Sequence, residues 1–121
     1  MPAYGFAHLH DRRPHPDIVE YLERIQDTLT PFHGRFRIHG GRTEVVEGSW
    51  TGNMVLIEFP DLATARAWYD SPAYEAIKRL RADHIDGDLV LVEGVGPDYD
   101  PAERARKLLA DGGAGTAGTA S

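Results

Sequence analysis

Hydrophobic residues recur along the chain with two periods, which predict alternating strands and helices. Ala3–Leu9 is a short apolar and aromatic run followed by charged residues and two prolines, as is typical of a strand that ends at the surface. From Asp17 onward, the apolar positions 18, 22, 25 and 29 fall on one face of a helix. The sequence therefore predicts a strand over 3–9 and a helix from Asp17 to a break at Pro31.

The middle of the chain reads as three strands. Arg35–His39 and Thr43–Glu47 are strand-like runs separated by Gly40-Gly41, a dipeptide that accepts the positive φ angles of a tight hairpin. Asn53–Phe59 carries four consecutive apolar residues and is the strongest strand candidate.

Two helices and a last strand follow. Asp61 is placed as the N-cap of a helix over 62–70, and Ser71-Pro72 as the cap and first residue of a helix over 72–83. After Gly87, the Leu-Val-Leu-Val run within Asp88–Glu93 predicts a buried strand. The expected order is β-α-β-β-β-α-β.

This order predicts the α+β class. It matches the ferredoxin-like split βαβ arrangement with an extra strand, an antiparallel sheet with helices on one face. Strands 53–59 and 88–93 are apolar on both faces, so the uncovered face of the sheet needs a partner. We expect a homodimer packed sheet against sheet.

The chain of 121 residues has room for one domain of ordinary size. We place that domain at 1–97. Asp100, Pro101 and Glu103 stand as N-cap, N1 and N3 of a short C-terminal helix over 98–111. The remaining segment, 112–121, is rich in glycine and is expected to be a flexible tail.

Composition excludes several classes of function. With 19 acidic and 13 basic residues the net charge is −6, which disfavours nucleic acid and anionic membranes as partners. The absence of cysteine excludes thiolate metal ligands and a cysteine nucleophile. No signal peptide or membrane-spanning run is evident, so the expected location is cytoplasmic.

Several short motifs follow one another between about residues 3 and 96. They are Tyr4, Gly34-Arg35-Phe36, Gly40-Gly41, Glu47-Gly48 with Trp50, Glu58-Phe59-Pro60, Ala67-Trp68-Tyr69, Ser71-Pro72 with Tyr74, Arg81, and Val92-Glu93-Gly94. In this order they resemble the domain of unknown function 1330 family. The resemblance implies the dimeric α+β barrel superfamily, which includes cofactor-independent monooxygenases, polyketide cyclases, muconolactone isomerases and haem-binding members.

Histidines on the first strand are the first candidates for chemistry. Strand alternation places His8 and His10 on one face, where two imidazoles can chelate one metal ion. Because the first strand lies beside the third in a ferredoxin-like sheet, Glu58 is the candidate third ligand of a divalent metal site. The alternative is that His10 and Glu58 are solvated and that His8 is hydrogen-bonded at the dimer interface.

The second strand carries positive charge. Arg35, Arg37 and His39 alternate with apolar residues, which predicts a cationic stripe that can hold a carboxylate or an enolate. Alternatively, these side chains face water or pair with Glu44 and Glu47 across the hairpin. The candidate catalytic residues are His8, His10, His39 and Arg35.

Aromatic residues beside a basic residue suggest a pocket for a flat, oxygenated organic molecule. Alternatively, most of these aromatic side chains belong to the core. The candidate substrate-binding residues are Trp50, Trp68, Tyr69, Tyr74 and Arg81.

Three classes of function fit these residues. The first is a small enzyme of secondary metabolism or natural-product biosynthesis that uses histidine or arginine and needs no cofactor. The second is a non-catalytic protein that binds a small-molecule ligand or acts as an accessory protein. The third is a metalloprotein that uses His8, His10 and Glu58.

Overall fold

The computed structural model describes residues 1–10 and 12–112, and its centre is a four-stranded antiparallel sheet. The strands are β1 (Ala3–His10), β2 (Arg35–His39), β3 (Asn53–Phe59) and β4 (Asp86–Glu93). Their order across the sheet is β2-β3-β1-β4, with β1 paired to both β3 and β4. This is the predicted α+β, ferredoxin-like arrangement.

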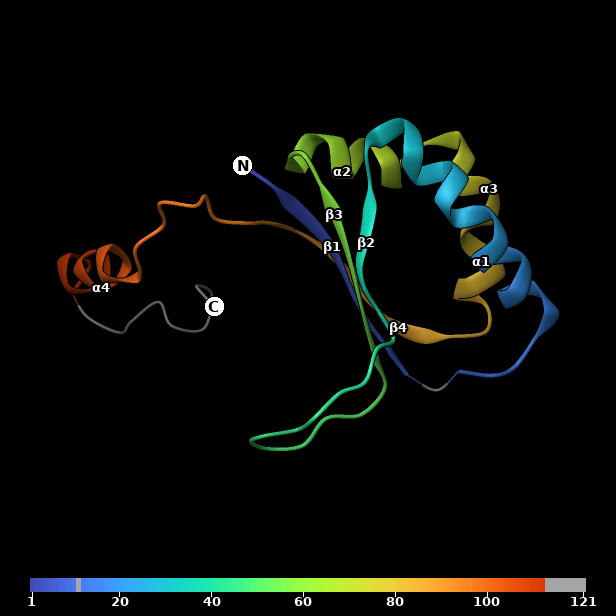
Figure 1. The fold of residues 1–121 in the computed structure, drawn as a ribbon, viewed down its shortest axis with the longest axis horizontal. Helices are drawn as coiled ribbons and strands as arrows, with labels where there is room; N and C mark the ends of the chain where they lie inside the picture. The colour runs from blue at the N-terminus through green and yellow to red at the C-terminus, as the bar shows by residue number, and fades with distance from the viewer. Residues whose placement is uncertain (11, 113–121) are drawn as a thin grey trace.

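Three helices cover one face of this sheet (Figure 1). They are α1 (Pro16–Leu29), α2 (Leu62–Tyr69) and α3 (Pro72–Ala82). A single 3₁₀ turn, Thr30–Phe32, follows α1 and leads into β2. No helix lies over the opposite face of the sheet in the described part of the chain.

Helix starts follow the capping signals of the sequence. The carboxylate of Asp61 accepts from Thr64 N–H, and the Ser71 hydroxyl accepts from Tyr74 N–H. The pKa of Asp61 is lowered, chiefly by a hydrogen bond with the Thr64 side chain and then by the bond from the Thr64 N–H. At α1 the cap is His15, one residue before the helix starts at Pro16.

The predicted strand over 43–47 is wrong. Residues 40–52 form an exposed loop between β2 and β3, and Val46 within it is 90% exposed. β2 pairs with β3, and its outer edge is not paired with Thr43–Glu47; residues without a hydrogen-bonded neighbour do not form a strand. The sheet therefore has four strands, without the predicted extra one.

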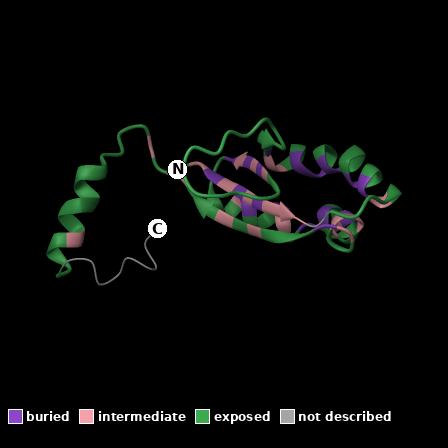
Figure 2. Ribbon diagram, turned by 90° about the horizontal axis from the view of Figure 1, so that it is seen from below, coloured by how far each residue is buried: buried purple, intermediate pink, exposed green. Residues whose placement is uncertain are grey.

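The core lies between the sheet and α1–α3, where buried residues on the helices face buried residues on the strands (Figure 2). On β1 the inward residues are small, and they are Ala3, Gly5 and Ala7. Large side chains on α1, α2, α3 and β3 fill most of the space above them. The largest fully buried ones are Trp68, Tyr74, Phe59, Leu29 and Ile77.

The other side of the sheet, which we call the open face, is apolar along its centre. Phe6 on β1 lies between Leu56 on β3 and Val90 on β4, and Tyr4 is paired with Val92 in the same way. Val90 and Val92 are about half exposed. An apolar sheet surface of this kind is normally covered.

The C-terminal helix α4 (Pro101–Ala110) is capped by Asp100, as predicted, and has no buried residue. It stands apart from the sheet in Figure 1. The predicted tail lies outside the described residues, apart from Gly112. None of the described helices is both long and apolar enough to cross a membrane.

Candidate functional site

A cavity of about 510 Å³ lies between the sheet and helices α1 and α3. We call it the sheet–helix cavity. Small side chains make its floor, because Gly5 and Ala7 of the central strand leave the space that larger residues would fill. Ile18 and Ile25 of α1 and Ile57 of β3 are among its apolar walls. Its volume falls in the range of roughly 300–1,000 Å³ that is typical of small-molecule sites.

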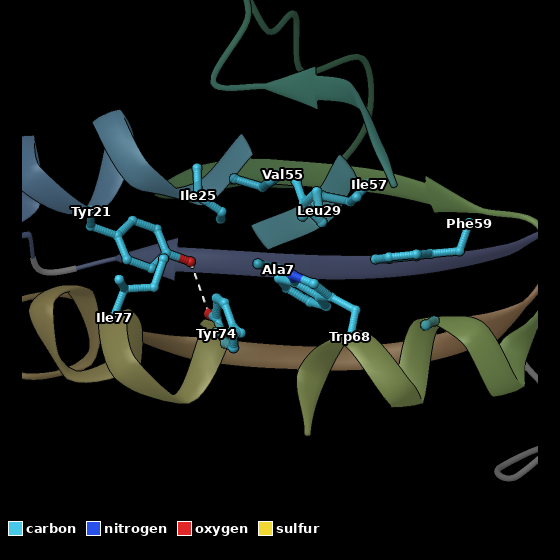
Figure 3. Packing of buried hydrophobic residues seen from close by; sticks show 11 residues of the cluster. Ala7, Tyr21, Ile25, Leu29, Val55, Ile57, Phe59, Trp68, Tyr74 and Ile77 are labelled. Carbon is cyan, nitrogen blue, oxygen red and sulfur yellow. Dashed lines mark hydrogen bonds between the residues drawn. The ribbon is translucent and has the colours of Figure 1, made fainter. Parts of the chain in front are cut away.

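Two buried tyrosines lie on the helical wall of this cavity. Tyr21 on α1 and Tyr74 on α3 face each other, with their hydroxyl oxygens 2.8 Å apart (Figure 3). Burial, and then the neighbouring Tyr74, raises the pKa of Tyr21 far above its ordinary value. Tyr21 is therefore a neutral phenol in the folded protein, able to donate a hydrogen bond but not to act as a phenolate base.

Arg81, near the end of α3, brings positive charge to the site, and the exposed Arg12, which precedes α1, also lines the cavity. Its guanidinium carbon lies 6.0 Å from the centroid of the Tyr21 ring. Partial burial acts to lower its pKa, but the tyrosine oxygens, Tyr74 first and then Tyr21, outweigh this and raise it. Within the described part of the chain, no carboxylate lies within 4.0 Å of this guanidinium. Arg81 thus stays charged beside the cavity, with phenols rather than an acidic side chain as neighbours.

Trp68 of α2 forms the adjoining aromatic wall. Its ring centroid lies 4.3 Å from that of Tyr74, and its indole N–H donates to the hydroxyl of Thr28 at 3.0 Å. The polar edge of this buried side chain is therefore satisfied inside the protein. Its ring is almost fully buried and contributes to the apolar lining of the cavity.

Polar residues at the strand ends line the same cavity. His10 ends β1, His39 ends β2, and Asn53 begins β3; antiparallel pairing places these three positions at one end of the sheet. The His39 ring stacks on Phe36 with centroids 4.5 Å apart. The predicted catalytic residues His10 and His39 thus share a cavity with Tyr74 and Arg81.

The predicted cationic stripe on β2 is wrong, because a β-bulge interrupts the alternation. Phe36 pairs with Ile57 and Ile38 with Leu56, so the register shifts at Arg37. As a result, His39 turns toward the cavity. Arg37 instead donates to Glu58 on the open-face side, with Nε 2.6 Å from Oε1. The bulge separates His39 from the arginines with which the sequence grouped it.

The register does not bring the three predicted metal ligands together. Glu58 is paired with Tyr4, whereas His8 is paired with Met54 at the other end of β3. His8 and His10 are neighbours, with ring centroids 5.5 Å apart. However, Nε2 of His8 lies 2.6 Å from the carbonyl oxygen of Thr51, to which it can only donate.

Three further predicted residues lie outside the sheet–helix cavity. Trp50 sits in the loop over 40–52 and stacks on His8, with centroids 4.3 Å apart. Tyr69 lies under the ammonium of Lys78, which is 4.1 Å from its ring centroid. Arg35 lines a second, more open hollow beside His33.

Tyr21 is the cavity residue that sequence reasoning missed. It lies three positions after Ile18 and four before Ile25, which places it on the buried face of α1. The prediction gave this place to Leu22, which is 47% exposed. A polar aromatic residue at helical spacing within an apolar face was the signal that marked it.

Comparison with known proteins agrees with this fold. A search of the curated proteins found no significant match. Among solved structures, the chain resembles a protein of unknown function from Rhodopseudomonas palustris, with a TM-score of 0.60 and 15% identity over 79% of this chain and 84% of that one. It also resembles a dimeric ferredoxin-like protein of unknown function from Jannaschia sp. CCS1, with a TM-score of 0.51 and 19% identity over 74% and 98% of the two chains. Such low identities establish the fold alone.

The family model for the domain of unknown function (DUF1330) matches residues 2–95, and the chain therefore belongs to this family.

Proposed function

We propose that the protein binds a small, flat organic anion in the sheet–helix cavity. The observation that carries this proposal is the partly buried Arg81 guanidinium, which lies beside the cavity next to two phenols and has no carboxylate near it among the described residues. A partly buried charge is costly unless it is paired. A carboxylate or enolate oxygen of a ligand would supply the missing partner.

The surrounding residues suit such a ligand. Tyr21 and Tyr74 offer hydroxyl groups near the guanidinium, and a charge-assisted hydrogen bond to an anion is stronger than a neutral one. The ring of Trp68 and the aliphatic walls suit the apolar part of a flat molecule. This binding mode needs no cofactor.

Binding can be followed through tryptophan fluorescence. The chain has two tryptophans, so a Trp50→Phe variant leaves Trp68 in the cavity wall as the single reporter. We expect benzoate and larger aryl carboxylates to change its emission saturably, whereas the neutral amides of the same shape bind more weakly. Equal responses to acids and amides would contradict a charged binding partner.

Arg81→Met tests the charge itself. It retains the apolar stem and removes the guanidinium, and we expect carboxylate affinity to fall about tenfold or more. Arg79→Met is the matched control, because Arg79 lies on the same helix but is exposed and paired with Asp83 at 3.3 Å. Loss of binding in both variants would point to a change in α3 rather than in the site.

A second candidate function is proton transfer to or from such a ligand. His10 and His39 both line the cavity, and an imidazole there could take a proton from a carbon of the ligand while Arg81 holds the resulting enolate oxygen. In D₂O the enzyme would exchange that C–H proton for deuterium, which NMR detects. Exchange should be lost in His39→Gln or in His10→Gln. If the wild type binds the ligand but does not exchange its proton, the protein binds without catalysing proton transfer.

The open face supports a homodimer. Phe6, Leu56 and Val90 form an apolar patch over which no described helix lies, and the similar protein from Jannaschia is described as dimeric. We expect the wild type to run as a dimer in light scattering and Leu56→Asp to run as a monomer. Val19→Asp, at an equally apolar but isolated position on α1, should remain dimeric. A monomeric wild type would contradict this part of the proposal.

A further inference from the structure

A second cluster of ligating side chains lies outside the sheet–helix cavity. His15 precedes α1, Asp17 lies in its first turn, and His84 lies between α3 and β4. The Asp17 Oδ2 atom is 3.1 Å from His84 Nε2 and 3.5 Å from His15 Nδ1. One ligand atom from each of the three residues lies within 4.8 Å of the other two. The sequence could not reveal this cluster, because His84 is 67 positions from Asp17.

Backbone hydrogen bonds hold the two segments together. The N–H of Arg13 donates to the carbonyl of His84 at 2.9 Å, which ties the start of α1 to the end of α3. The N–H of His84 donates in turn to the carbonyl of Arg81 at 3.0 Å. The positions of the three side chains are therefore set by the fold rather than by an ion.

The ring of His15 is held by contacts with Asp17 and His84. Its Nδ1 accepts a hydrogen bond from the backbone N–H of Asp17 at 3.1 Å, so this nitrogen carries a lone pair and no proton. That nitrogen also lies 3.5 Å from Oδ2 of Asp17, so both atoms can reach one ion once the hydrogen bond from the Asp17 N–H is released. The two imidazole rings stack, with their centroids 3.8 Å apart.

We propose that His15, Asp17 and His84 bind a divalent transition-metal ion of the zinc class. Two neutral imidazoles and one carboxylate are a common ligand set for such ions, and three protein ligands leave a position for water. His84 is the less exposed of the two histidines, with 18% of its side chain exposed against 44% for His15. Its Nε2 donates to the Asp17 carboxylate, so this proton must move to Nδ1 before Nε2 can bind the ion. Two parallel stacked rings cannot both direct a lone pair at one ion, so binding requires His15 to turn out of the stack.

The test is a titration of tag-free, chelator-treated protein with Zn²⁺, followed by calorimetry and by NMR of the imidazole resonances. We expect one ion per chain, with the largest shifts at His15 and His84, whose stack opens. His84→Ala and Asp17→Asn should each weaken binding by about tenfold or more. Circular dichroism establishes that each variant is folded. If either fails to fold, the resonance shifts of the wild type decide the question alone.

His8 and His10 supply the matched control, because they are the other histidine pair in contact. A His8→Ala/His10→Ala variant should bind Zn²⁺ as the wild type does. Binding that disappears in this double variant and persists in His84→Ala would overturn the proposal, as would a wild type that binds no Zn²⁺ at millimolar concentration. Neither outcome bears on Arg81, so this test is independent of the proposed anion site.

Discussion

The hydroxyl oxygens of Tyr21 on α1 and Tyr74 on α3 lie 2.8 Å apart inside the helical layer. Residues 53 positions apart thus meet on the wall of the sheet–helix cavity, next to Arg81. This hydrogen bond satisfies both buried phenols without any acidic side chain. It joins the two helices that pack side by side over the sheet.

Removing both of these hydroxyl groups should lower the free energy of unfolding by less than the sum of the two single removals. Tyr21→Phe leaves the buried Tyr74 hydroxyl without its partner, and we expect the free energy of unfolding to fall by about 1–3 kcal/mol. In Tyr21→Phe/Tyr74→Phe no orphaned group remains, so the loss should be smaller than the sum of the two single losses. Urea denaturation measures all three. If the loss in the double variant equals or exceeds the sum of the two single losses, the two hydroxyls act independently.

The raised pKa of Tyr21 predicts a loss of stability in alkali. In the unfolded chain Tyr21 ionises near its ordinary pKa of 10.0, whereas burial, followed by the effect of Tyr74, keeps it protonated in the folded protein. The folded state therefore binds more protons above pH 10, and its stability falls as the pH rises. Urea denaturation between about pH 8 and 11 should show that the free energy of unfolding declines less steeply with pH in Tyr21→Phe than in the wild type. Identical slopes would mean that Tyr21 titrates alike in both states.

Filling the cavity from its floor should abolish binding without unfolding the protein. Ala7 lies on the cavity side of β1, and Ala7→Leu adds apolar volume where the ligand is expected. We expect the free energy of unfolding to stay within about 1 kcal/mol of the wild type while carboxylate binding is lost. Ala76→Leu adds the same volume at an exposed position of α3 and should bind normally. Undiminished binding by Ala7→Leu would place the ligand elsewhere.

His33 and Gly34, two adjacent residues after the 3₁₀ turn, should respond to substitution with opposite changes in stability. His33 has a φ of +59°, a left-handed conformation that glycine adopts without strain, so His33→Gly should raise stability by about 1 kcal/mol. A Cβ at Gly34 would lie 2.8 Å from a Leu29 methyl carbon and 2.9 Å from the Phe59 ring. Gly34→Ala should therefore lower stability by about 1–3 kcal/mol. Thermal denaturation of both variants checks the pair, and destabilisation by His33→Gly would refute the strain argument.

Periodicity and capping chemistry predicted most of the fold. The strand over Arg35–His39 and the caps at Asp61 and Ser71 were predicted where the structure has them, because these features depend on residues close in sequence. The strand over 43–47 failed for the opposite reason. Its residues have strand-forming character, but a strand exists only with a hydrogen-bonded neighbour, and these residues do not pair with the free edge of β2.

The candidate site was predicted only in part, for the same reason. Trp68, Tyr74 and Arg81 were identified from residue type, and they do line one cavity. The bulge at Arg37, which turns His39 inward, has no glycine or other local signal in β2. The contact between Asp17 and His84 depends on how α1 packs against α3, a relationship between distant segments that periodicity does not encode.

A crystal structure of the protein with 4-bromobenzoate would test the central claim most directly, because the anomalous signal of bromine shows where the ligand lies. We predict a bromine peak inside the sheet–helix cavity, near Trp68, with the carboxylate within hydrogen-bond distance of the Arg81 guanidinium. A cavity without the ligand, or a carboxylate held at the strand ends by His10 and His39 and away from Arg81, would contradict the account.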